Sequence, residues 1–505
     1  MSKRIEFGDF QTPAELSEFV VNLVGEIFGT PDVVIEPTCG VGAFLAAAVQ
    51  QWGSATKCLG YEINPVYVEQ AQGLSGSNDV CIEQADFFTV DWRNIFHKQQ
   101  NAKVLILGNP PWVTNSKLGV LEGTNLPEKT NFQRHRGFDA KTGKSNFDIS
   151  EWMLIKLIEN MPPTGALAML CKTSTARKVL RQFWKNNRGF EKAYMFMIDA
   201  KTYFSASVDA CLLYVSGHSL TNECTVYPSL SLAKPNARFG YVNGDLVADM
   251  DAFTSTRYLD QGTTTYVWRS GIKHDAAKIM ELDVTPRGFV NGLGELVHIE
   301  KNFVYPLLKS SDIGNGRTLP RKFVIVPQKS AGDETAIIQS VVPLTWQYLM
   351  DHAEILDNRK SSIYKGRPRF SIFGIGDYSF APWKIAISGL YKKIRFVLVG
   401  PFEDKPVMVD DTCYMIPCYS EEEGRLLLEL LKSGDATTFF NSLVFEDSKR
   451  PITAEILKRF SFISAAKSIG LLGGLRRFVY DDASSNGSAR QLMLLMERDE
   501  TYLTT

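Results

Sequence analysis

The stretch "VVIEPTCGVGAFLAAAV", residues 33–49, decides the fold of the N-terminal half of the chain. It opens with a short apolar run typical of a buried strand, passes through a tight loop, and continues with the apolar spacing of a helix. Gly40 and Gly42 in the loop let the backbone approach a ligand closely. A GxG pair alone is weak evidence, because many such turns are merely tight connections, so the surrounding pattern must support the assignment.

The surrounding segments alternate between strand-like and helix-like patterns up to about residue 220. This alternation predicts a mixed, mostly parallel sheet with helices on both faces, which is an α/β, Rossmann-like domain. Sheets of this kind bind ligands at the carboxyl ends of their strands. The expected strands lie at 32–37, 56–63, 80–88, 103–109 and 165–172, and the expected helices at 15–28, 44–52, 65–74 and 149–161.

The pattern changes near residue 225, where proline, glycine and aromatic residues become frequent and apolar runs become short. The later segments include strand-like runs such as "RKFVIVPQ" and "WKIAISGLY" and helix-like runs such as "EEEGRLLLELLKSG", which favour an α+β domain. We therefore expect an α/β domain at 1–225, a connecting region at 226–255, and an α+β domain with a helical C-terminal part at 256–505.

Composition limits the class of protein. The 505 residues are too many for one ordinary core, and 44% hydrophobic and 22% charged residues are values of a soluble globular protein. No apolar run approaches the ~18 residues of a membrane span, and no apolar segment of a signal peptide follows the charged start. The eight cysteines form no CxxC pair, so we expect no metal site and a cytoplasmic protein without a membrane.

The net charge of −1 hides two strongly basic stretches. Residues 172–192 contain seven Lys/Arg and one acid, and residues 359–395 contain nine Lys/Arg and one acid. Basic surfaces inside a neutral protein indicate a polyanionic partner. In the second stretch aromatic residues interleave with the cations, which fits a surface with an aromatic core and cationic edges.

Three acidic residues follow three successive expected strands. Glu62 lies 22 residues after Gly40, where a carboxylate accepts hydrogen bonds from ribose hydroxyls. Asp86 can accept an adenine amino proton, and Phe87 beside it can cover the ring. Glu36 would repel a pyrophosphate but suits a sulfonium or ammonium group. These features favour S-adenosylmethionine over NAD as the cofactor.

The tetrapeptide Asn109-Pro110-Pro111-Trp112 ends the fourth expected strand. An aromatic amino group is a poor nucleophile, because its lone pair is delocalised into the ring. The side-chain oxygen of Asn109 and the carbonyl of Pro110 can accept its two N–H groups and localise that lone pair toward a methyl donor. The prolines fix φ and hold both acceptors in place, and the indole of Trp112 can stack on the base.

Taken in order, these motifs resemble the γ-class DNA amino-methyltransferases, and more narrowly the TaqI-like N6-adenine enzymes. "FGDFQTPAELSEFVVNL" resembles the family element that covers the methionine end of the cofactor, and "EPTCGVGAF", "YEINP", "ADFF" and "NPPW" follow in the family order. "AKTYFSASVDACLLYV" (200–215) resembles the element whose phenylalanine contacts the flipped adenine, here Phe204. Residues 367–400 resemble segments of target-recognition domains. Family members usually have Tyr or Phe where this chain has Trp112.

The resemblance implies a site-specific DNA adenine-N6 methyltransferase that flips its base, with a catalytic domain followed by a target-recognition domain. It implies a prokaryotic, DNA-associated protein with S-adenosylmethionine as cofactor, double-stranded DNA as partner and a monomer on DNA. The sequence does not decide whether a separate restriction endonuclease encoded elsewhere accompanies it. The implied residues are Asn109, Pro110, Pro111 and Trp112 for catalysis; Thr12, Pro13, Glu36, Pro37, Cys39, Gly40, Gly42, Glu62, Ile63, Asp86, Phe87 and Asn109 for the cofactor; Trp112 and Phe204 for the base; and Arg367, Arg369, Lys384, Lys392, Lys393 and Arg395 for DNA.

Three alternatives remain open from the residues themselves. The same tetrapeptide serves enzymes that methylate glutamine in proteins, because a carboxamide nitrogen poses the same electronic problem. It also serves some RNA adenine methyltransferases. A catalytically silent DNA-binding subunit is the third alternative, although every position that bears chemistry holds a competent residue. The long remainder of the chain, with its basic centre at residues 359–395, favours DNA over protein glutamine.

Overall fold

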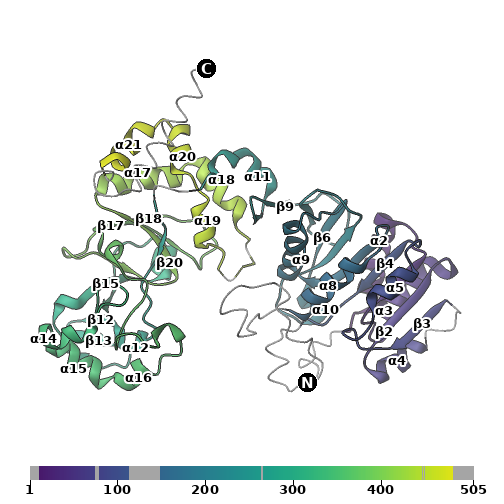
Figure 1. Cartoon of the computed structure of the whole chain (residues 1–505), viewed down its shortest axis with the longest axis horizontal. Helices are drawn as coiled ribbons and strands as arrows, with labels where there is room; N and C mark the ends of the chain where they lie inside the picture. Colours follow the sequence, from purple (N-terminus) through teal and green to yellow (C-terminus); the bar gives the residue numbers. More distant parts are fainter. Residues whose placement is uncertain are drawn as a thin grey trace. The chain divides into compact units, whose positions relative to one another are not determined.

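The computed structural model describes residues 11–73, 79–112, 148–262, 266–445, 447–448 and 450–481 (Figure 1). The chain forms two compact units, Met1–Met250 and Asp251–Thr505, called here the first and the second unit. Residues 226–255, expected as a connecting region, instead contain β9 (Ala237–Val242) and β10 (Asp245–Val247), which continue the sheet of the first unit. The short strands and turn residues of this region resemble a linker in sequence, because only pairing to a neighbouring strand gives them regular structure.

The first unit is built on one ten-stranded sheet in the order β10-β9-β8-β6-β7-β5-β4-β1-β2-β3. Strands β3, β2, β1, β4 and β5 run parallel to one another, so their carboxyl ends share one edge, whereas β7 is antiparallel to both of its neighbours. The remaining strands are β1 (Val33–Glu36), β2 (Lys57–Glu62), β3 (Val80–Gln84), β4 (Val104–Gly108), β5 (Ala166–Lys172), β6 (Lys192–Ile198), β7 (Ala210–Ser216) and β8 (Glu223–Tyr227).

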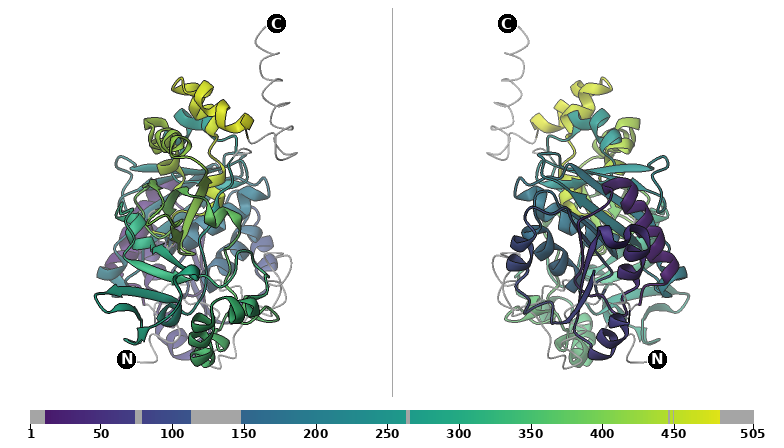
Figure 2. Two further views of the ribbon diagram at one scale, coloured as in Figure 1. Left: turned by 90° about the vertical axis from the view of Figure 1, so that its left-hand side faces the viewer. Right: turned by 90° about the vertical axis from the view of Figure 1, so that its right-hand side faces the viewer.

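Helices flank this sheet on both faces (Figures 1 and 2). On one side α2 (Ala14–Phe28) packs on α3 (Ala43–Trp52), and both contribute to a core cluster that also contains Trp112 and Phe204. On the other side α8 (Ile149–Asn160) packs between α5 (Trp92–Lys98) and α9 (Thr173–Lys185). The doubly covered sheet confirms the expected α/β, Rossmann-like fold.

The local sequence explains where several helices begin. The Asn64 side chain accepts the Val66 amide at the start of α4 (Pro65–Gln72), whose first residue is proline, and Asp148 accepts the Ser150 amide at the start of α8. The expected strand at 80–88 ends earlier, because Asp86 accepts the Phe88 amide and turns the chain. Helix α5 was not expected, since its seven residues are too few to show a clear period.

The second unit is α+β. One sheet has the order β14-β13-β12-β16-β15-β19 and another the order β11-β20-β17-β18. Their strands are β11 (Arg269–Ser270), β12 (Glu281–Thr285), β13 (Gly288–Asn291), β14 (Leu296–Val297), β15 (Val304–Leu308), β16 (Lys322–Ile325), β17 (Trp383–Ser388), β18 (Val397–Val399), β19 (Met408–Val409) and β20 (Cys413–Cys418). Helices α17 (Glu421–Lys432), α18 (Gly434–Leu443), α20 (Phe462–Ser468) and α21 (Leu472–Asp481) follow.

A buried ionic network joins the strands of the second unit. Glu281, at the start of β12, accepts from the Lys309 ammonium at 2.6 Å and lies 3.3 Å from Nε2 of His274. Lys309 also lies 3.4 Å from Asp410, which follows β19. Burial by itself raises the pKa of Glu281, but the His274 and Lys309 partners outweigh it and lower the pKa to about 2. The Glu281 carboxylate is therefore held in its charged form.

None of the helices in the described ranges is both long and apolar enough to cross a membrane.

Candidate functional site

The loop between β1 and α3 forms the centre of the candidate site. Gly40 and Gly42 both have positive φ, +54° and +88°, a conformation that a side chain would strain. A Cβ at Gly40 would lie 2.7 Å from Oε1 of Gln11, the end of an exposed, flexible side chain, so the backbone conformation is the main restriction at this residue. The buried Pro37 and Cys39 anchor the loop, and the Cys39 amide donates to the Tyr61 carbonyl of β2 at 2.8 Å.

Glu62 holds this loop from the end of β2. One carboxylate oxygen accepts the Gly40 amide at 2.9 Å, and the other accepts the Asn64 amide at 2.8 Å. A carboxylate has about four lone-pair directions, so these two bonds leave acceptor capacity for a ligand. Ile63 follows with 45% of its surface exposed, which places an apolar side chain beside the carboxylate.

Glu36 differs from the other two acids, because it is 2% exposed. Burial is the largest cause that raises its pKa well above the usual range; the Leu45 amide opposes this and the nearby Glu62 charge adds to it. One of its oxygens has no hydrogen-bond partner among the described residues. Burial therefore favours the neutral form of the Glu36 carboxyl group. A nearby sulfonium or ammonium group, as expected from the sequence, would favour the charged form instead.

The turn after β3 brings Asp86 to the same edge of the sheet, with its side chain half-buried. The ring of Phe87, expected to cover a cofactor ring, instead lies in the core at 5% exposure. It packs 4.9 Å from Trp92 and 6.0 Å from Trp152, measured between ring centroids. The sequence does not reveal this, because both phenylalanines of "ADFF" are equally apolar and only the turn decides which one points inward.

The segment before α2 reaches the glycine loop. Thr12 and Pro13 are half-buried, and the Pro13 carbonyl accepts the Ser17 amide in the first turn of the helix. Gln11 accepts the Val41 amide at 3.4 Å and was not expected to contribute. The sequence signal for Gln11 was its position two residues before Pro13, the N-cap residue of α2.

Asn109, Pro110, Pro111 and Trp112 follow β4, between the ends of β1 and β5. The tetrapeptide therefore lies at the edge that also carries Glu36 and the glycine loop. Gly108, immediately before Asn109, lies beside Glu36, since a Cβ there would be 3.5 Å from Cγ of that residue. The structure thus brings the expected acceptor residues and the expected cofactor residues together.

The two expected base-contacting rings also meet. Trp112 and Phe204, the last residue of α10 (Ala200–Phe204), pack edge to face with ring centroids 5.2 Å apart. The indole N–H of Trp112 donates to the Leu170 carbonyl at 3.4 Å. Both rings are at most 7% exposed, so a base reaches a ring face only if a neighbouring group moves.

A lysine that the sequence did not single out holds this tetrapeptide. Nζ of Lys172, the last residue of β5, donates to the Trp112 carbonyl at 3.0 Å and to Oδ2 of Asp148 at 2.5 Å. The only available signal was its position at a strand end, within the basic stretch 172–192.

The basic stretch 172–192 is partly neutralised where it forms α9. Lys178 pairs with Glu151 at 3.3 Å, and Arg181 pairs with Asp245 at 3.3 Å. These ion pairs lower the positive charge that this helix presents, which argues against reading the whole stretch as a phosphate-binding surface.

The expected DNA-binding residues of the second unit have different surroundings. Lys384 is 1% exposed, its Nζ donates to the Ala381 carbonyl, and burial lowers its pKa to about 7. The expectation that Lys384 binds DNA is wrong for this structure, because β17 lies between two strands and is covered on both faces. Arg369 forms an exposed two-oxygen pair with Asp357, which offsets its charge.

The other four candidates keep accessible cations. Lys392 and Lys393 are exposed in the turn between β17 and β18, and Arg395 is half-buried in the same turn. Arg367 is exposed, with its guanidinium 5.9 Å from the ring centroid of Phe373.

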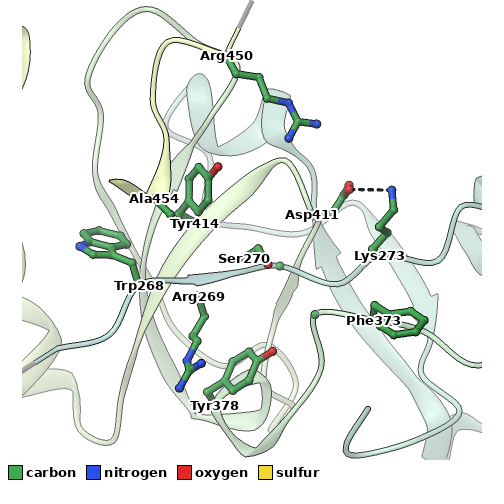
Figure 3. A pocket seen from close by; sticks show the side chains of 12 residues that line it. Trp268, Arg269, Ser270, Lys273, Phe373, Tyr378, Asp411, Tyr414, Arg450 and Ala454 are labelled. Atoms are coloured by element: carbon green, nitrogen blue, oxygen red, sulfur yellow. Dashed lines mark hydrogen bonds and ion pairs between the residues drawn. The ribbon is translucent and has the colours of Figure 1, made fainter. Parts of the chain in front are cut away.

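Phe373 also lines a pocket of about 540 Å³ in the second unit (Figure 3). Aromatic and cationic side chains from distant segments line this pocket. Arg269, on β11, lies 5.2 Å from the ring centroid of Tyr378, and Arg450 approaches from the opposite side. Lys273 pairs with Asp411 at 3.2 Å inside the pocket and with Asp275 at 2.7 Å. Figure 3 labels the lining residues Trp268, Arg269, Ser270, Lys273, Phe373, Tyr378, Asp411, Tyr414, Arg450 and Ala454.

Known proteins match both the sequence and the fold. Residues 2–177 match the family model described as N-6 DNA methylase. The type II methyltransferase M.NspV of Nostoc sp. is 43% identical over 473 residues, which cover 92% of this chain and 98% of that protein. The type II methyltransferase M.HincII of Haemophilus influenzae is 23% identical over 226 residues, 44% of this chain and 39% of that protein.

Among solved structures, that of the type IIL restriction-modification enzyme MmeI in complex with DNA aligns with a TM-score of 0.50. The alignment has 14% identity and covers 94% of this chain and 69% of that one, so it concerns the fold alone. The similarity to M.NspV extends over nearly the whole of both chains. The chain therefore belongs to the type II methyltransferases of the N-6 DNA methylase family.

Proposed function

We propose that this enzyme transfers a methyl group from S-adenosylmethionine to N6 of an adenine that it flips out of double-stranded DNA at a specific site. The observation that carries the proposal is the position of Asn109-Pro110-Pro111-Trp112 at the sheet edge that also holds the glycine loop and Glu62. The type II relatives support a role in DNA protection within a restriction-modification system, beside a separate endonuclease.

The residues present fit S-adenosylmethionine. The positive φ of Gly40 and Gly42 lets the protein backbone turn tightly beside a ligand, and Glu62 retains acceptor capacity for ribose hydroxyls. Asp86 is placed to accept from an adenine amino group. The buried Glu36 oxygen without a partner among the described residues supports a cationic ligand group nearby, because a cation would stabilise its charged form. When bound, S-adenosylmethionine supplies a methyl group activated at a sulfonium centre.

The protein's part in the transfer is to prepare the amino group. The side-chain oxygen of Asn109 and the carbonyl oxygen of Pro110 would accept hydrogen bonds from the two N–H groups of adenine N6. The nitrogen lone pair would then be localised on N6 and directed at the methyl group that the cofactor supplies. N6 would then bear the methyl group, its two protons and a positive charge, which the two acceptors would stabilise before one proton leaves to water. Because the prolines restrict φ, little reorganisation is needed as the reaction proceeds.

The base pocket is formed by Trp112 and Phe204. Flipping costs a few kcal/mol, and each aromatic contact with the base offsets about 1–3 kcal/mol of it. The exposed Arg367, Lys392 and Lys393 and the half-buried Arg395 of the second unit are proposed to contact DNA, with the enzyme acting as a monomer.

A substrate comparison tests this function. The purified protein, incubated with tritium-labelled S-adenosylmethionine, is expected to label double-stranded DNA and to leave RNA and glutamine-containing protein unlabelled. Label in RNA or protein alone would support one of the alternative methyltransferases, and no label in any of them would support a silent DNA-binding subunit.

The cofactor site gives a separate prediction. Glu62→Ala and Asp86→Ala should each weaken S-adenosylmethionine binding by about 1–3 kcal/mol, because each removes a charged acceptor. Isothermal titration measures the change. Glu83→Ala is the matched control, since Glu83 is an exposed acid on β3. Unchanged affinity in both site variants would place the cofactor elsewhere.

A further inference from the structure

A short ion pair beside the catalytic tetrapeptide involves a lysine to which no role has been assigned. Lys172 Nζ bridges the Trp112 carbonyl at 3.0 Å and the Asp148 carboxylate at 2.5 Å. The bridge is largely shielded from water, with the Lys172 and Asp148 side chains 21% and 8% exposed. A single ammonium therefore links the backbone carbonyl of Trp112 to the side chain of Asp148.

Asp148 is itself fixed. Its other oxygen, Oδ1, accepts the amide of Ser150 at 3.2 Å and the hydroxyl of Ser150 at 2.6 Å, which attaches the carboxylate to the first turn of α8. Lys172 is attached to β5, which pairs in parallel with β4. Through Lys172 and Asp148, the Trp112 carbonyl is therefore connected to two rigid elements, the strand β5 and the first turn of α8.

We propose that Lys172 and Asp148 are positioning residues. They hold the loop of residues 109–112, which carries the two proposed hydrogen-bond acceptors, in the position needed for catalysis. This inference rests on the proposed function. The Pro110 carbonyl has no side chain to steer it, so its direction depends on the backbone on either side. Gly108, the last residue of β4, precedes the loop and is held by its pairing with Met169 of β5. The lysine bridge supplies the restraint at the other end, and Asp148 neutralises its charge close to a site where positive charge develops.

Lys172→Met should lower kcat about tenfold or more, because small misplacements of a reacting group are costly, while S-adenosylmethionine affinity stays within about twofold. Lys172→Arg, which keeps the donor and the charge, should recover most of the rate. Lys178→Met is the control, since Lys178 is an exposed lysine of α9 that pairs with Glu151 instead.

An activity-independent readout separates this proposal from the function itself. Hydrogen exchange in a peptide covering Val104–Trp112 should be faster in Lys172→Met than in wild type. Asp148→Asn, which keeps a capping side chain, should show the same change if the methionine variant does not fold. Unchanged exchange with unchanged kcat, or a failure of arginine to rescue, would overturn the positioning role. Wild-type protein that labels no DNA would count against the proposed function only.

A second, independent observation concerns the pocket of the second unit (Figure 3). Three cations and one carboxylate line it, and the carboxylate of Asp411 is bound by Lys273. Neither Arg269 nor Arg450 forms an ion pair with an acid in the part of the chain that the structure describes. The net positive charge is therefore carried by these two arginines.

The geometry points to the DNA sugar–phosphate backbone as the ligand of this pocket. The Tyr378 ring supports the Arg269 guanidinium, which limits its conformations and lowers the entropy lost when it binds an anion. Arg367 lies against Phe373 of the same pocket, so one of the cations expected from the sequence joins the two new ones. This assignment rests on the proposed function, because it takes DNA as the polyanion.

The double variant Arg269→Ala/Arg450→Ala should lower the slope of log K against log salt by about two, since each phosphate contact contributes about 0.9. S-adenosylmethionine affinity should be unchanged. Arg287→Ala, in the exposed turn between β12 and β13, is the control. A double variant with the DNA affinity and salt slope of the wild type would overturn the assignment of this pocket. The proposed function would not be affected, because it is tested by DNA methylation with the wild type. Lys392 and Lys393, in the turn between β17 and β18, would then be the next residues to neutralise.

Discussion

Replacing Asn109 by alanine is expected to slow methyl transfer by about a hundredfold or more, equivalent to ~3 kcal/mol of transition-state stabilisation. The residue follows β4 directly, and its side-chain oxygen is buried rather than solvated. The oxygen interacts most strongly with N6 when that nitrogen becomes positively charged. The loss should therefore appear in the rate of the chemical step rather than in cofactor binding.

Single-turnover methylation of a DNA duplex measures this rate. Asn160→Ala, at the end of α8, serves as the control for a neutral asparagine change in the same unit. S-adenosylmethionine affinity of the Asn109 variant should stay close to that of wild type. A variant that methylates DNA within about tenfold of the wild-type rate would remove Asn109 from the acceptor role.

Glu281→Gln is expected to lower the free energy of unfolding of the second unit by about 3 kcal/mol at pH 7. The pKa of Glu281 falls from an ordinary 4.5 to about 2, and each tenfold change in proton affinity corresponds to about 1.4 kcal/mol. Glutamine also leaves Lys309 and His274 without their buried carboxylate. A thermal melt should show the unfolding of the second unit at a temperature lower by roughly 5–10 °C.

The sign of the pH dependence follows from the direction in which the pKa moves. A depressed folded-state pKa stabilises the fold fully above about pH 4.5, and the contribution is lost as pH falls toward 2. The difference between wild type and Glu281→Gln should therefore shrink by about half at pH 3. Glu354→Gln, an exposed acid on α16 (Ala353–Asp357), should not change the melt. Equal melting of Glu281→Gln and wild type at pH 7 would show that the network does not stabilise the fold.

The sequence predicts the first unit well because most of its strands and helices show their own apolar periodicity within a few consecutive residues. Apolar periods mark the five parallel strands and the helices α2, α3, α4 and α8, and the topology brings Glu36, Glu62 and Asp86 to one edge of the sheet. The direction of a side chain within a turn is not local information. Phe87 turns inward because Asp86 accepts the Phe88 amide, and nothing in "ADFF" distinguishes the two rings beforehand.

Charge patterns in the sequence predict accessible cations less well than apolar periods predict strands and helices. Lys384 counts as a cation in the basic stretch, yet alternation along β17 cannot show that both faces of this strand are covered. Arg369 likewise counts as a cation until the fold brings Asp357 to it. Conversely, Arg269 and Arg450 are far apart in the sequence, and only the fold brings both of them to the lining of one pocket. Long-range pairing decides which charges remain available.

The identity of the methylated atom tests the central claim most directly. DNA incubated with the protein and S-adenosylmethionine carrying a deuterated methyl group is digested to nucleosides and analysed by mass spectrometry. The proposed function predicts that the label appears in N6-methyladenine and is absent when Asn109→Ala replaces the wild type under the same brief reaction. Label in N4-methylcytosine or C5-methylcytosine, or N6-methyladenine formed equally by the Asn109 variant, would contradict it.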